Sequence, residues 1–77
     1  MAIYKVRIKT EDNTTTYTTN ATTLATVTFR PTLDKWDVSA PSIGMLADTQ
    51  EDADKVARES ITAFFASVGF TPDFITE

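Results

Sequence analysis

The sequence predicts an α+β fold, a two-layer sandwich with one helix packed on one face of an antiparallel sheet of 3–5 strands. Two patterns carry this prediction. Apolar and polar residues alternate in residues 3–9, 24–30 and 36–40, as they do in half-buried strands. Residues 49–68 instead repeat their apolar residues at helical spacing. The chain has 77 residues, which is room for one domain, so we expect residues 1–77 to form a single unit.

The first strand is predicted over residues 3–9, with an apolar face of Tyr4, Val6 and Ile8 and a basic face of Lys5, Arg7 and Lys9. Residues 11–13 and 20–23 have turn composition. Between them, residues 14–19 form a β-branched run with weak alternation, which is typical of a strand at a sheet edge.

An antiparallel hairpin is predicted from residues 24–30 and 36–40, because Pro31 ends the first alternating segment and a short connection follows. Residues 41–44 then read as a turn. Residues 45–47 are a short apolar stretch, which we interpret as a further short strand.

One helix is predicted, with Asp48-Thr49 as its N-cap and Asp52 three residues after Thr49. Its apolar stripe comprises Ala53, Val56, Ala57, Ser60, Ile61, Phe64 and Val68. Gly69 and Pro72 are stop signals, and residues 70–76 are either a closing edge strand or a tail.

The composition argues against an enzyme. The chain has no Cys and no His, so disulfides, Cys/His metal sites and the commonest general base are absent. The acidic group Asp48, Glu51, Asp52 and Asp54 is explained by a helix start, where the dipole favours negative charge. No Ser has a His to activate it, and two Gly residues are too few for a phosphate-binding loop. We therefore expect no catalytic residue, no cofactor and no metal.

No apolar run resembles a signal peptide or a membrane span, so a cytoplasmic location without membrane association is expected. A domain this short buries only about 60% of its unfolded surface. Because no disulfide is available to stabilise such a domain, association with another chain is the remaining means. The sequence therefore predicts a homo-oligomer or a complex with another protein.

Charge is unevenly distributed along the chain. Residues 1–35 carry five cations and three carboxylates, a net +2, whereas residues 36–77 carry two cations and eight carboxylates, a net −6. This acidic half favours a basic protein over nucleic acid as the partner. A solvated helix face explains the same carboxylates.

Each candidate binding residue also has a simpler structural explanation. Trp36 fits either a core position or an interface anchor. The strand at residues 14–19, with Tyr17, is a candidate for strand addition if its edge is unpaired. Lys5, Arg7 and Lys9 fit weak nucleic-acid contact, or a charged outer face that discourages aggregation.

Several short motifs occur in order between residues 27 and 69. They are Val27-Thr28-Phe29-Arg30-Pro31, Asp34, Trp36-Asp37-Val38, Pro41-Ser42-Ile43-Gly44, Ala47-Asp48-Thr49, Glu51-Asp52-Ala53 and Ala57-Arg58-Glu59-Ser60-Ile61. This pattern resembles the HicB-like antitoxin domain. The resemblance covers residues 24–69 as a core, and residues 1–23 form an extra strand pair.

The resemblance implies a sheet-plus-helix domain, related to a degraded ribonuclease-H-like fold, that belongs to a toxin–antitoxin system. It would mask a small basic toxin ribonuclease. Trp36 matches the family's aromatic strand position, residues 49–53 its helix opening, and Pro41, Ile43 and Gly44 its turn. The chain departs from the family in lacking Pro before Gly44, and no DNA-binding helix-turn-helix follows, so an orphan domain is expected.

The sequence therefore predicts a non-catalytic protein-binding module that resembles a HicB-type antitoxin. One alternative is a phage or mobile-element inhibitor that acts on a host protein, and a second is a weak nucleic-acid-binding domain. The candidate partner-binding residues are Trp36, Pro41, Ile43, Glu51, Asp54 and Tyr17, and the candidate nucleic-acid contacts are Lys5, Arg7 and Lys9.

Overall fold

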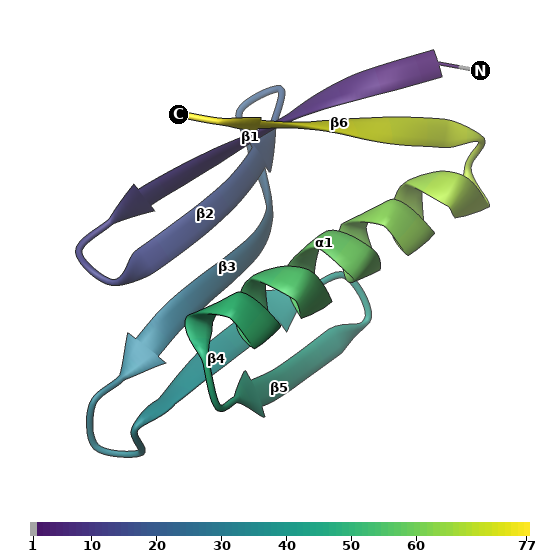
Figure 1. The fold of residues 1–77 in the computed structure, drawn as a ribbon. Coiled ribbons are helices and arrows are strands. Elements are labelled where there is room, and N and C mark those ends of the chain that lie inside the picture. Colours follow the sequence, from purple (N-terminus) through teal and green to yellow (C-terminus); the bar gives the residue numbers. More distant parts are fainter. Residues whose placement is uncertain (1) are drawn as a thin grey trace.

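A computed structural model describes residues 2–77, and it confirms an α+β fold with one helix against one sheet (Figure 1). The elements in chain order are β1 (Ala2–Glu11), β2 (Thr14–Thr19), β3 (Thr22–Arg30), β4 (Lys35–Ala40), β5 (Ile43–Ala47), α1 (Gln50–Ser67) and β6 (Phe70–Thr76). The strands lie in the order β5-β4-β3-β2-β1-β6. The expectation of 3–5 antiparallel strands is wrong in two respects, because the sheet has six strands and the pair β1–β6 is parallel.

The parallel pair follows from the path of the chain. Each of the four hairpin connections reverses direction, so β5 runs the same way as β1. The helix α1 crosses one face of the sheet and carries the chain back (Figure 1). Consequently β6 also runs in the direction of β1, and it pairs with β1 from Ala2 opposite Phe70 to Ile8 opposite Thr76.

Tight turns fix the positions of the first three strands. Asp12-Asn13 and Asn20-Ala21 each have two consecutive positive φ angles, 49° and 63° in both turns, which is the pattern of type I′ hairpins. These turns place β2 between β1 and β3. The expectation that residues 14–19 form an unpaired edge is therefore wrong: the two hairpins supply a neighbour on each side.

The helix begins as predicted, since the Thr49 hydroxyl accepts a hydrogen bond from the Asp52 N–H at 3.0 Å. Its buried stripe is Ala53, Ala57, Ile61 and Phe65. The expected stripe is thus partly wrong, because Phe64 and Val68 are exposed while Phe65 is buried. The positions 53, 57, 61 and 65 are four residues apart, which keeps them on one face.

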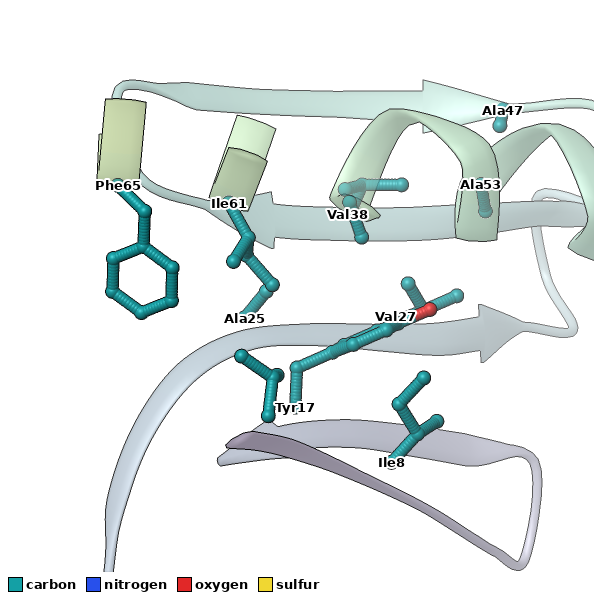
Figure 2. Close-up of a cluster of buried hydrophobic side chains, with 11 residues drawn as sticks. Ile8, Tyr17, Ala25, Val27, Val38, Ala47, Ala53, Ile61 and Phe65 are labelled. Carbon is teal, nitrogen blue, oxygen red and sulfur yellow. The ribbon is translucent and has the colours of Figure 1, made fainter. Parts of the chain in front are cut away.

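The core lies between this stripe and the covered face of the sheet (Figure 2). Figure 2 shows Ile61 and Phe65 of the helix directed toward the strands that carry Ala25, Val27 and Val38. The strands also bury Val6, Ile8 and Tyr17 from the N-terminal hairpin. That hairpin therefore contributes to the common core and is not an appendage.

Candidate protein-binding edge

The sheet has two edge strands, β5 and β6, and their free sides differ in chemistry. On β6, the Glu77 N–H donates to the Ile8 carbonyl at 2.8 Å, so residue 77 faces β1. Backbone groups alternate sides along a strand, which turns Pro72 toward the free side. Proline has no N–H, and Asp73 adds a charge beside it. The free side of β6 is therefore poorly suited to receiving another strand.

The strand β5 has neither feature, because its sequence Ile-Gly-Met-Leu-Ala contains no charge and no proline. Pro41 and Ser42 form the two-residue turn before it, with φ of +64° at Ser42, and Ala40 pairs with Ile43. A two-residue hairpin closes on a hydrogen-bonded pair. The backbone groups of Gly44 and Leu46 therefore point away from β4, toward the free side.

Three apolar side chains of β5 are accessible to solvent. Ile43 and Met45 are each 39% exposed and Leu46 is 48% exposed. Between β5 and α1 lies an open groove of about 460 Å³, lined by Met45, Leu46, Ala47, Asp48, Asp52, Lys55, Val56 and Glu59. The groove has an apolar floor and a charged helical wall beside a free strand edge, which is the arrangement used in strand addition.

The turn before β5 is tied to the helix. The Ser60 hydroxyl donates to the Pro41 carbonyl at 2.5 Å, and this bond joins the turn before β5 to α1 across 19 residues of sequence. It explains why Ser60, which the sequence placed in the apolar stripe, is half-buried. The helix α1, which forms one wall of the groove, is thus attached to the turn before β5 by a direct hydrogen bond.

The carboxylates around the groove differ in their pairing. Asp48 forms an ion pair with Lys35. The hydrogen bond from the Lys35 ammonium and the attraction of its charge lower the pKa of Asp48, and the same pairing raises the pKa of Lys35. Asp52 and Glu59 form no ion pair within residues 2–77. Their charges are therefore available to a partner, with Lys55 between them on the wall.

Two of the predicted partner-binding residues lie beside this edge. Pro41 is in the turn and Ile43 begins β5. Glu51 is exposed in the first turn of α1, outside the groove lining. Trp36 is half-buried and packs against Phe29, with ring centroids 5.0 Å apart, in the manner of a core residue.

Tyr17 and Asp54 come together in the structure, where they and Glu51 line a second open pocket of about 330 Å³. Tyr17 is 0% exposed, and its hydroxyl donates to the Asp54 carboxylate. That carboxylate also accepts from Arg58 Nε at 2.9 Å, and the Arg58 guanidinium lies 5.1 Å from the centroid of the Phe74 ring. This polar cluster lies at the border of the core, where the helix is separated from β1 and β2. It provides the buried Tyr17 hydroxyl with a hydrogen-bond acceptor.

The basic residues of β1 lie on the face of the sheet opposite the helix. Arg7 is 3.7 Å from Glu77, and Lys9 is 3.8 Å from Glu11, so two of the three cations have acidic neighbours. Tyr4 and Tyr17 belong to the other face, against the core. Bases therefore have no aromatic ring beside Lys5, Arg7 and Lys9 on which to stack, which removes one support for nucleic-acid binding.

Sequence reasoning did not select Met45, Leu46, Asp52 or Glu59 as partner-binding residues. The available signal was a short, uncharged apolar run directly after a tight turn, but its position at the sheet edge depends on the strand order. The position of Asp52, three residues after the N-cap Thr49, is compatible with a free carboxylate, because the bond to Thr49 uses only the Asp52 backbone N–H.

Within residues 2–77, no helix combines the length and the apolar composition that crossing a membrane requires. Comparisons with models of protein families, with curated proteins and with solved structures found no match to this chain.

Proposed function

We propose that this chain is a non-catalytic module that binds another protein by receiving one of its extended segments as a further strand beside β5. The observation that carries the proposal is the contrast between the two edges. The free side of β6 has Pro72 and Asp73, whereas β5 offers the outward backbone groups of Gly44 and Leu46 and no charge. Natural sheets usually protect such an edge, so an unprotected one marks an interaction site.

The groove beside β5 supports the same proposal. An incoming strand places alternate side chains on the two faces of the extended sheet, and one set would enter the groove. Burial of the half-exposed Ile43, Met45 and Leu46 would contribute roughly 25 cal/mol for each Å² removed from water. Backbone hydrogen bonds would supply the orientation.

We further propose that the partner is basic, as in the antitoxin resemblance, where the module masks a small basic toxin ribonuclease. The support is the net −6 charge of residues 36–77, which include β5 and α1, together with the unpaired carboxylates of Asp52 and Glu59. Pro41, Ile43 and Gly44, the turn residues that carry the resemblance, lie at the start of the same edge.

The test compares two matched substitutions of exposed leucines. Leu46→Asp places a charge on the β5 edge, while Leu33→Asp makes the same change at a residue that is 54% exposed in the connection between β3 and β4. A photo-crosslinking residue is installed at position 43 in each chain, and the chains are expressed in the native cell.

We expect the Leu33→Asp chain to crosslink the same partner as the unsubstituted chain, and the Leu46→Asp chain to lose it. Circular dichroism melts establish that both variants are folded. Retention of the crosslinked partner by folded Leu46→Asp would contradict the proposal.

A further inference from the structure

We infer that the segment received by β5 is a strand with cationic residues on its groove side and β-branched or aliphatic residues on its other side. This inference rests on the proposed function and specifies the partner that the edge fits. It follows from the different chemistry of the two faces of β5, because alternate residues of an added strand meet different surroundings.

The helix-facing side of β5 contains Ile43, Met45 and Ala47. The register shows this, because Ala40, Val38 and Trp36 are their respective partners on β4, and Val38 and Trp36 pack in the core. Residues of an added strand on this side therefore enter the groove between β5 and α1. Their side chains meet an apolar floor that includes Met45 and Val56, with charged groups of the helix beyond it.

Lysine and arginine fit this combination better than other side chains. Their aliphatic stems can lie on apolar surface while their charged ends remain hydrated. The ends then reach the level of Asp52 and Glu59, the two groove carboxylates without an ion-pair partner in residues 2–77. Asp48 is a weaker partner for an incoming cation, because it already forms an ion pair with Lys35.

The opposite side of β5 carries Gly44 and Leu46. A methyl group added at Gly44 would have only the Val38 carbonyl oxygen as a neighbour, at 3.9 Å, so the space over Gly44 is open. Leu46 beside it is 48% exposed. A valine or isoleucine on the added strand would cover Gly44 and contact Leu46, which favours β-branched residues at these alternate positions.

A second copy of this chain fits the edge less well. Pairing β5 with another β5 would bring Ile43, Met45 and Ala47 to the groove side and supply no cation there. It would also bring together two helical walls that each contain two carboxylates, Asp52 and Glu59, against one cation, Lys55, in chains whose net charge is −4. Charge complementarity therefore selects a basic segment of another protein.

The experiment uses the full chain and a synthetic peptide, acetyl-Lys-Val-Lys-Val-Lys-Val-Lys-amide, carrying a fluorophore. A second peptide replaces every lysine by glutamate. A third, Lys-Lys-Val-Val-Val-Lys-Lys, keeps the composition and the charge but loses the alternation. Binding is measured by fluorescence anisotropy, and amide chemical shifts of Gly44 and Leu46 locate the site.

We expect the alternating lysine peptide to bind and to shift the Gly44 and Leu46 amides, and both other peptides to bind at least about fivefold more weakly. Asp52→Asn/Glu59→Gln should weaken binding of the alternating peptide at least about fivefold, because it removes both carboxylates that the lysines would pair with. The matched control, Asp73→Asn/Glu77→Gln at the other edge, changes the net charge equally and should weaken binding less than twofold.

Equal losses in the two double variants would overturn the inference, because binding would then follow net charge alone. Equal binding of the glutamate peptide, or of the non-alternating peptide, would overturn it too. So would a wild-type dimer in light scattering that Leu46→Asp converts to a monomer, since the occupant of the edge would then be a second copy. Loss of partner crosslinking in Leu46→Asp alongside any of these results would leave the proposed function standing.

Discussion

At the scale of single residues, the pair Lys35–Asp48 determines which carboxylates of the groove remain without an ion-pair partner. Lys35 begins β4, and Asp48 follows β5 immediately before the N-cap of α1. Their ion pair joins the start of one strand to the end of its neighbour. As a result, Asp48 is neutralised locally, and the unpaired groove carboxylates are those of the helix, Asp52 and Glu59.

Lys35→Gln is expected to raise the pKa of Asp48 toward its ordinary value of 3.8, because the hydrogen bond and the charge that lower it are both removed. The lowered pKa means that the pair contributes stability above pH 3.8 and loses it as pH falls through the folded-state value. The raised pKa of Lys35 means that this contribution is also lost as pH rises above 10.5.

The measurement is a titration of the Asp48 carboxyl carbon by nuclear magnetic resonance. Lys9→Gln, which removes a cation on β1 that pairs with Glu11, serves as the control and should leave the Asp48 pKa unchanged. A wild-type Asp48 that titrates at its ordinary pKa would show that the ion pair does not form in solution.

Local side-chain chemistry was predictable at this scale, and long-range contacts were not. Asp12-Asn13 and the Thr49 cap follow from what these residues do to their own backbone. The bond from Tyr17 to Asp54 spans 37 residues, and no pattern along the chain brings them together. Both were candidate partner contacts, but the structure places them in one partly buried polar cluster.

At the scale of elements, the helix shows why periodicity alone combined residues of two adjacent stripes into one prediction. Ala53, Ala57, Ile61 and Phe65 are spaced by four, and so are Val56, Ser60, Phe64 and Val68. The sequence supports a stripe through either set. The sheet selects the first, and small Ala53 and Ala57 allow the helix to approach the strands closely there. The second set is left beside the groove and at the exposed end of the helix.

Phe65→Ala and Phe64→Ala are expected to differ in their effect on the free energy of unfolding. Phe65 is 5% exposed, and the centroid of its ring lies 5.8 Å from that of Tyr4, so its truncation should cost about 3–5 kcal/mol. Phe64 is 45% exposed, and its truncation should cost less than about 1 kcal/mol. Urea denaturation measures both. Equal costs would mean that the helix is rotated relative to this structure.

At the scale of the whole molecule, the strand order determines which surfaces remain free. The alternation of residues 3–9, 24–30 and 36–40 predicted strands that the structure contains, with bounds extended by a few residues. The order of the strands was not predictable, because it depends on where β6 docks after α1 crosses the sheet. This non-local step left β5 as a free edge, whereas the two local hairpins gave β2 a neighbour on each side.

The same step gives the N-terminal hairpin its place in the architecture. Residues 1–23 lie outside the part of the sequence that resembles the HicB-like domain, yet β1 and β2 stand between β3 and β6 in the sheet. They bury Val6, Ile8 and Tyr17 in the common core. The boundary at residue 23 is therefore a boundary of sequence resemblance, and it does not divide the folded structure into separate units.

Pro72→Val/Asp73→Val should convert β6 into a second open edge and cause concentration-dependent self-association. The change restores an outward N–H donor and removes the charge beside it, while leaving the inward groups that pair with β1 in place. The average mass from light scattering should rise with concentration well above that of the unsubstituted chain. Pro31→Val/Asp37→Val makes the same substitutions away from both edge strands, in the connection before β4 and in β4 itself, and should leave the mass unchanged. If the β6 variant has the same average mass as this control, then Pro72 and Asp73 are not what keeps the β6 edge unpaired. The contrast between the two edges would then no longer single out β5 as the binding site.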